Sequence, residues 1–175
     1  MPVVPSFLKR LFLSPGGGLR AVVGPGSKAP VLRVKNHNEG TIDLGKLYDN
    51  YTLFIYFYPK AYTNNCKLQA ESINKFYDKL RSRGVEVLGV TTDTPCAVRC
   101  CRERTHLEFL LVSDIEGELA RAFGIPMKFG FVQPCGLLVR NGIVVWRSDK
   151  LDPERIGCVL MDALDSLGIV ESANV

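Results

Sequence analysis

The sequence contains no long apolar run, no secretory signal pattern and no cluster of basic residues. No window comes near the ~18 consecutive apolar residues of a membrane-spanning helix, so we expect no membrane span. Lysine and arginine are scattered and the formal net charge is +4, which argues against nucleic acid as a partner. The composition, 46% hydrophobic and 23% charged, is that of an ordinary globular protein, and 175 residues are enough for one domain.

Acidic residues are also absent from the first part of the chain, in which Glu39 is the first one. Residues 7–12 are predicted to form a short basic amphipathic helix, and the SPGGG segment ends it. Residues 1–23 are therefore interpreted either as an organellar, for example mitochondrial, targeting segment or as a disordered tail, and both alternatives stay open. Residues 24–175 are interpreted as one domain.

The six cysteines do not indicate the disulfide framework of a secreted protein, because the chain is not small and has enough apolar residues to fold without cross-links. We expect an intracellular, reducing compartment, either a mitochondrion or another organelle or otherwise the cytoplasm. In such a compartment a few of the thiols would be redox-active and the rest structural.

Strand and helix patterns alternate along the domain. The apolar runs YTLFIYFY (51–58) and GVEVLGVTT (84–92) are typical of central strands that are buried on both faces. Between them, residues 64–83 carry a helical stripe of apolar side chains. A strand, a helix and a strand in this order predict a βαβ unit with parallel strands. Further strands are predicted at 30–34, 41–44 and 108–114 and in a hairpin at 136–146, and further helices at 93–104, 116–125 and 152–168. The predicted fold class is α/β, with a mixed central sheet and helices on both faces.

Cys66 follows the first central strand, at the end of the stretch PKAYTNNC. Residues 63–65 are predicted to cap the helix, so Cys66 would lie in its first turn, where free backbone N–H groups and the helix dipole stabilise a thiolate. The helical stripe also turns Cys66 towards the core, so its position alone leaves open whether it fills space or reacts. Pro59 and Thr63 would form a small polar cup around its sulfur.

The segment FYPKAYTNNC resembles the peroxiredoxin signature Pro-x-x-x-Thr-x-x-Cys, with Pro59, Thr63 and Cys66 at the defined positions. The likeness continues through KAPVLRV, GTIDLGKL, RGVEVLGVTTDTP and FLLVSDIEGELARAFGI, in the order of that family, and spans roughly residues 24–167. It is closest to the bacterioferritin-comigratory, or Q-type, branch.

This resemblance implies a thioredoxin-like fold and a thiol-dependent peroxidase that reduces hydrogen peroxide and small organic hydroperoxides, with no metal or organic cofactor. Cys66 would be the peroxidatic cysteine, Thr63 would orient the peroxide, and Pro59 would shield the sulfenic acid that forms. A thioredoxin-like reductant protein would recycle the oxidised protein, which we expect to be a monomer or a homodimer.

The sequence departs from the family at two positions. Alignment of the hairpin at Asn141-Gly142 puts Gln133 where the family has an arginine beside the thiolate, and glutamine brings no positive charge. This change favours an alternative function, a peroxide sensor or redox relay that does not turn over. The second departure is Glu71, which occupies the place of the resolving cysteine of many Q-type members.

The next helix supplies other candidates for the resolving cysteine. Family spacing favours Cys101, then Cys100, and the alternative is that Cys101 only faces the core while Cys100 is incidental. A disulfide to Cys66 is expected to need local unwinding of one or both helices. Three arginines that would help to keep these thiols ionised lie on the same helix: Arg99, Arg102 and Arg104.

The remaining cysteines and the histidines are given structural interpretations. A zinc site built from His106 and the cysteines of the preceding helix, Cys96 among them, is disfavoured because their spacing matches no zinc pattern. Cys135 and Cys158 lie in strand and helix patterns and are predicted to be core residues. His37 lies in a turn and is predicted to face solvent.

Overall fold

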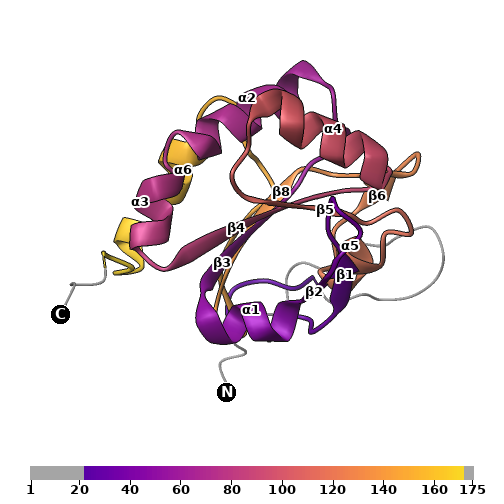
Figure 1. Cartoon of the computed structure of the whole chain (residues 1–175). Coiled ribbons are helices and arrows are strands. Elements are labelled where there is room, and N and C mark those ends of the chain that lie inside the picture. The colour runs from indigo at the N-terminus through magenta and orange to yellow at the C-terminus, as the bar shows by residue number, and fades with distance from the viewer. Residues whose placement is uncertain (1–21, 172–175) are drawn as a thin grey trace.

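A five-stranded sheet forms the centre of the computed structural model, which describes residues 22–171 (Figure 1). Its strands are β3 (Thr52–Phe57), β4 (Val85–Thr91), β5 (Leu110–Ser113), β8 (Cys135–Arg140) and β9 (Ile143–Ser148). They lie in the order β5-β4-β3-β8-β9. β3, β4 and β5 are parallel, β8 is antiparallel to β3, and β9 is antiparallel to β8. The prediction of a mixed sheet with a parallel βαβ unit is thus confirmed.

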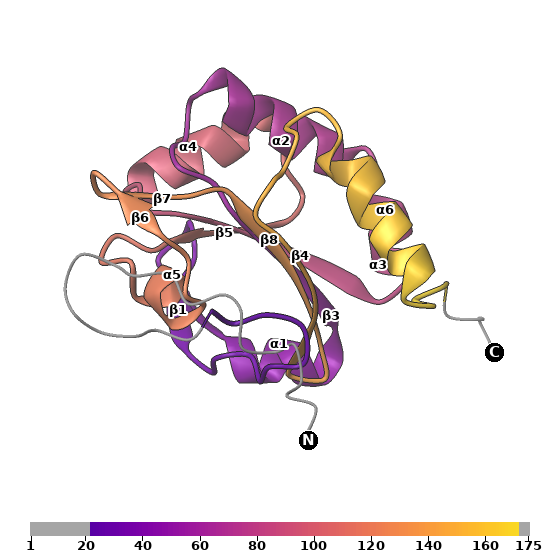
Figure 2. The same cartoon turned by 180° about the vertical axis from the view of Figure 1, so that it is seen from behind.

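Helices cover both faces of the sheet, as predicted (Figures 1 and 2). One face carries α2 (Asn64–Asn74), α3 (Tyr77–Ser82), α4 (Pro95–Thr105) and α6 (Ile156–Ser166). The other carries α1 (Leu44–Asn50) and α5 (Glu118–Ala122). In the part of the chain that is described, no helix is both long and apolar enough to cross a membrane.

The two faces have separate hydrophobic cores because successive side chains of β3 point to opposite sides. Phe54 and Tyr56 belong to the core under α2, α3, α4 and α6, whereas Leu53, Ile55 and Phe57 belong to the core under α1 and α5. All six residues of β3 are buried, which explains why its sequence is almost continuously apolar.

Two short antiparallel pairs lie outside the central sheet. The first is β1 (Arg33–Lys35) with β2 (Thr41–Asp43), and the second is β6 (Met127–Lys128) with β7 (Phe131–Val132). The turn of the second pair is formed by Phe129 and Gly130, which both have positive φ, 52° and 81°.

The helix predicted at 64–83 is divided into α2 and α3, with a break at Lys75 and Phe76. The predicted apolar stripe is nevertheless buried on both sides of the break. The break lies where α6 approaches most closely: a Cβ added to Gly157 would be 2.3 Å from the carbonyl oxygen of Ser72 and 2.7 Å from the ring of Phe76. The turn at Phe76 therefore lets its ring pack on Gly157.

Two other predictions are wrong. His37 is buried, 5% exposed, because the β1–β2 connection folds against β5, where the His37 N–H donates to the carbonyl of Leu111 (2.9 Å). Cys158 is exposed on the outer side of α6 rather than in the core, since Ile156 and Leu160 occupy the inner side. Cys135 is buried as predicted.

The predicted basic helix at 7–12, and most of the N-terminal segment 1–23, lie outside the described residues. At the boundary, the carbonyl of Val23 accepts a hydrogen bond from the guanidinium of Arg147 (2.8 Å). This bond attaches the first described residues to β9.

Candidate active site

Cys66 lies in the first turn of α2, as predicted. Thr63 is the N-cap: its Oγ1 accepts a hydrogen bond from the Cys66 N–H (3.2 Å) and donates one to the carbonyl of Lys60 (3.1 Å). Thr63 is exposed, and Pro59, at the start of the same loop, is half-buried. The loop between β3 and α2 thus places Cys66 at the positive end of a helix dipole, beside an exposed hydroxyl.

The sulfur of Cys66 lies 3.8 Å from the sulfur of Cys101, which α4 contributes. Both side chains are buried, with 6% and 4% of their surface exposed. A disulfide bond is ~2.05 Å long, so the remaining gap between the sulfurs is small. Both helices are intact while the sulfurs are in contact, and whether closing the remaining gap needs local unwinding of a helix stays a prediction.

The other two cysteines of α4 do not share this position. Cys100 is half-buried and points towards Tyr62 of the β3–α2 loop, and Cys96 is exposed. Within residues 22–171, no three His, Cys, Asp or Glu side chains gather as a potential metal site.

The two facing thiols titrate as a pair. Their mutual hydrogen bond lowers the pKa of Cys101 to about 6 and raises that of Cys66. Burial also raises both pKa values, the Tyr62 backbone N–H lowers both, and the carboxylate of Asp93 raises both. The pair therefore carries one negative charge near neutral pH and keeps its second proton. Cys101 has the lower pKa of the two and holds this charge, so Cys66 becomes the thiolate when its proton passes across the sulfur contact to Cys101.

Asp93 is a site residue that the sequence reasoning missed. Its carboxylate accepts hydrogen bonds from the Ala61 N–H, in the β3–α2 loop, and from the Thr91 hydroxyl (3.3 Å). A signal was present: β3 and β4 are parallel, so the loops at their carboxyl ends meet at one edge of the sheet. Asp93 follows β4 there, as Ala61 follows β3.

Two buried tyrosines lie beneath the thiol pair and were also missed. Tyr56 and Tyr58 stack with ring centroids 5.5 Å apart. Burial raises the pKa of both hydroxyls, and the charge of Cys66 raises them further. The Tyr58 hydroxyl has no hydrogen-bond partner among the described residues. Their apolar strand pattern marked them only as core residues.

Gln133 lies between β7 and β8 and is half-buried. Its backbone N–H donates to the carbonyl of Pro126 (2.9 Å), and its side-chain amide donates to the carbonyl of Phe131 (3.4 Å). Over the described range, no hydrogen bond joins Gln133 to a thiol. Its relation to the thiolate therefore stays a prediction.

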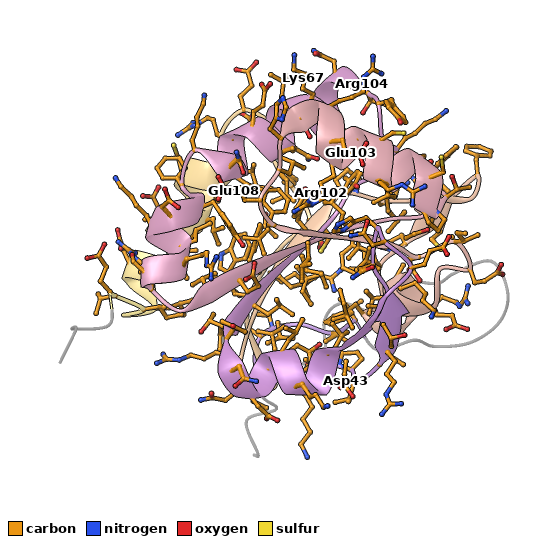
Figure 3. The ribbon with its side chains drawn as sticks, in the orientation of Figure 1. Asp43, Lys67, Arg102, Glu103, Arg104 and Glu108 are labelled. Atoms are coloured by element: carbon orange, nitrogen blue, oxygen red, sulfur yellow. The ribbon has the colours of Figure 1, made fainter. Side chains whose placement is uncertain are left out.

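The arginines of α4 have separate surroundings, and two of them, Arg102 and Arg104, are labelled in Figure 3. Arg102 donates to backbone carbonyls between α4 and β5, its Nε at 3.2 Å from the nearer oxygen. The guanidinium of Arg104 lies over the ring of Tyr62, 5.9 Å from the centroid, and Arg99 is exposed. The low pKa of Cys101 is accounted for by hydrogen bonds, not by these charges as predicted.

Comparison with known proteins gives consistent matches. The sequence model of the AhpC/TSA family matches residues 25–147 of the chain. A chloroplastic peroxiredoxin Q from Suaeda salsa is 27% identical over 139 residues, which is 77% of this chain and 64% of that protein. Peroxiredoxin Bcp from Escherichia coli is 38% identical over 73 residues, 42% of this chain and 47% of that protein. The chain thus spans less than two thirds of the length of either relative.

Among solved structures, peroxiredoxin Q from Xanthomonas campestris superposes with a TM-score of 0.72 and 25% identity. The match covers 77% of this chain and 90% of that one. The architecture described above is therefore a thioredoxin-like fold shared with a solved relative.

Proposed function

The chain belongs to the AhpC/TSA family, in the branch of the Q and Bcp peroxiredoxins, and on this premise we propose that it is a thiol-dependent peroxidase. Its substrates would be hydrogen peroxide and small organic hydroperoxides. The observation that carries the proposal is the buried pair of Cys66 and Cys101, with its sulfurs 3.8 Å apart and one of its protons readily lost.

The first step is an attack by the Cys66 thiolate on the terminal oxygen of the hydroperoxide. A sulfur–oxygen bond forms, the oxygen–oxygen bond breaks, and the alkoxide or hydroxide leaves and takes up a proton. Cys66 becomes a sulfenic acid. Thr63 would orient the peroxide with its exposed hydroxyl, and Pro59 would close one side of the pocket. The N-cap geometry of Thr63, which accepts from the Cys66 N–H, supports this placement.

In the second step the Cys101 sulfur attacks the Cys66 sulfenic acid. A disulfide forms, and the hydroxyl group leaves as water. The sulfur contact supports Cys101 rather than Cys100 as the resolving cysteine, because Cys100 is directed at Tyr62 and, among the described residues, has no hydrogen bond to the Cys66 sulfur. A thiol that is already in contact competes well with a second peroxide molecule for the sulfenic acid.

The third step returns the disulfide to two thiols by exchange with a dithiol protein of the thioredoxin type. The reductant donates two electrons and leaves as its own disulfide. Cys66 and Cys101 are almost completely buried, so the reductant would reach them after the first turn of α2 opens. Thr63 is exposed at that turn, and opening it would break the cap hydrogen bond from the Cys66 N–H to the Thr63 hydroxyl.

A sensor or relay on the same fold is the second candidate function, and Gln133 is the observation that favours it. Without an arginine beside the thiolate, each turnover could be slow, and oxidation would pass to a partner protein instead. Both candidates use the same cysteine pair, so the difference between them lies in repeated turnover.

Peroxide consumption with thioredoxin and thioredoxin reductase tests the proposal. We expect the protein to consume many equivalents of hydrogen peroxide or tert-butyl hydroperoxide per molecule. Consumption of a single equivalent would indicate the sensor. Cys158→Ser is a matched control, because it removes an exposed thiol on α6, outside the site, and it should turn over like the natural protein.

A further inference from the structure

Tyr62, in the loop before the site, has an unusual backbone conformation. Its φ is 65°, in the left-handed region, and its side chain is 52% exposed. A bulky residue rarely adopts such a φ, and does so only where its surroundings hold it there. Contacts on both sides of Tyr62 provide such surroundings.

The neighbours of Tyr62 in the chain are both fixed. The Ala61 N–H donates to the carboxylate of Asp93, and Thr63 caps α2 while its hydroxyl binds the carbonyl of Lys60. Tyr62 therefore connects two anchored residues, and its peptide N–H has little freedom to turn.

The side chain of Tyr62 is held by α4. The guanidinium of Arg104 lies 5.9 Å from its ring centroid, within the range of a cation–π contact. Hydrogen bonding with the thiol of Cys100 raises the pKa of the Tyr62 hydroxyl to about 12. The helix that carries Cys101 thus also anchors the loop that leads to Cys66.

The backbone N–H of Tyr62 acts on the ionisation of both thiols. It lowers the pKa of Cys66 and of Cys101, whereas the carboxylate of Asp93 raises both. The other titratable groups beside the pair are the hydroxyls of Tyr56, Tyr58 and Tyr62, which bring no positive charge. A negative charge on the pair therefore depends on the hydrogen bond between the two thiols and on a backbone donor rather than on a cation.

We propose that Tyr62 is a positioning residue, whose ring is clamped on α4 by Arg104 and Cys100 so that its strained backbone directs its N–H at the sulfurs of Cys66 and Cys101. This inference rests on the proposed function, because it concerns the stability of the reacting thiolate. It assigns a chemical role to a side chain that is held by α4 and not to one of the reacting thiols.

The central test is Tyr62→Ala. Alanine loses the clamp and is disfavoured at positive φ, so the N–H should turn away from the sulfurs. We expect the rate of Cys66 oxidation by hydrogen peroxide at pH 7 to fall about tenfold, in line with the loss of one hydrogen bond to a charged group. The pH profile of alkylation, followed for the Cys66 and Cys101 peptides by mass spectrometry, should move to higher pH.

Two variants serve as comparisons. Tyr62→Phe keeps the ring under Arg104 and should recover most of the rate, which a general loss of structure would not allow. Tyr51→Ala removes a tyrosine that is also exposed (42%) but lies before β3, at the opposite end of that strand from the site. It should leave both the rate and the pH profile unchanged.

Arg104→Gln separates the clamp from a direct effect of charge. If Arg104 acts through Tyr62, the substitution slows the natural protein but has no further effect in Tyr62→Ala. An equal effect in both backgrounds would mean that the charge acts on the thiols directly, and the clamp would be wrong.

A folded Tyr62→Ala protein with the natural rate and the natural pH profile would overturn the inference. The proposed function would stand in that case, provided that Cys66→Ser in the same assay is inactive. If Cys66→Ser reacts like the natural protein, the proposed function itself fails, and the two failures are thereby distinguished.

Discussion

Two buried cysteines lie near the same end of β3 but on opposite faces of the sheet. Cys135, on β8, pairs with Phe57 and belongs to the core under α1 and α5. Cys66 follows β3 in the chain and belongs to the core under α2, α3, α4 and α6. They are 1% and 6% exposed, so burial hardly distinguishes them.

Their partners do distinguish them. Burial raises the pKa of Cys135, and the carboxylate of Asp149, which accepts its hydrogen bond (3.3 Å), raises it further. Cys66 meets a second thiol and a backbone N–H, so one of two protons leaves easily. Burial next to a carboxylate keeps a thiol neutral. Two buried thiols that share a hydrogen bond lose the first of their two protons more easily, so the pair can supply a thiolate.

Removal of each cysteine in turn gives the largest contrast. Cys66→Ser should abolish peroxide consumption in the thioredoxin-coupled assay, because the thiolate is the nucleophile. Cys135→Ser should keep it, because the residue lies on the other face of the sheet and the serine hydroxyl can still donate to Asp149. Turnover by Cys66→Ser would show that Cys66 is not the peroxidatic cysteine. Loss of activity in Cys135→Ser alone would assign that role to Cys135.

Removal of the partner thiol should have the next largest effect. Cys101→Ser should react with the first equivalent of peroxide but then accumulate Cys66 sulfinic acid, since the sulfenic acid has no thiol at 3.8 Å to condense with. Cys96→Ser, which removes an exposed thiol of the same helix, is the matched control and should turn over. Intact-mass measurement during the reaction distinguishes these outcomes, and full turnover by Cys101→Ser would exclude Cys101 as the resolving cysteine.

The pH dependence should differ between the two thiol environments. Ionisation of the pair with a pKa of about 6 predicts that the rate of Cys66 oxidation rises with pH up to that value and is level above it. Below it the rate should fall by about tenfold per pH unit, because the thiolate is the reacting form. Alkylation of Cys135 should still be rising at pH 9. Stopped-flow oxidation between pH 4.5 and 9 measures the pH profile of Cys66. A Cys66 rate that still rises at pH 9 would refute the pKa of about 6 for the pair.

Introduction of a charge at position 133 should have the smallest effect. If Gln133 faces the pocket, Gln133→Arg would add a charge-assisted hydrogen bond worth about 1–2 kcal/mol more than a neutral one, or about 5- to 30-fold in rate. Stopped-flow oxidation with the pair's pKa measured alongside checks this. An unchanged pKa in a folded variant would show that position 133 does not face the sulfurs.

The sequence predicted the sheet, both helical layers and the place of Cys66, because strand alternation and helix capping are local patterns. It did not predict the break before Tyr77, since that break depends on the contact of Phe76 with Gly157 of a distant helix. Asp93 and the buried position of His37 were missed for the same reason. Asp93 depends on the meeting of the loops after β3 and β4, and His37 depends on the packing of the β1–β2 connection against β5.

The sequence reduced the candidates for the resolving cysteine to two neighbours but could not decide between them. Cys100 and Cys101 are adjacent, and only the rotation of α4 about its axis decides which sulfur faces Cys66. That rotation is set by packing against β5 and α2, and a side-chain pattern with a cysteine at both positions carries no signal for it.

Peptide mapping after one equivalent of hydrogen peroxide tests the central claim most directly. The protein is oxidised at neutral pH, free thiols are blocked, and the cross-linked peptides are identified by mass spectrometry. We predict an intramolecular disulfide between Cys66 and Cys101, with Cys135 still a free thiol. A Cys66 sulfenic or sulfinic acid with Cys101 still reduced, or a disulfide from Cys66 to Cys96 or Cys100, would contradict the assignment of the facing pair as the redox couple.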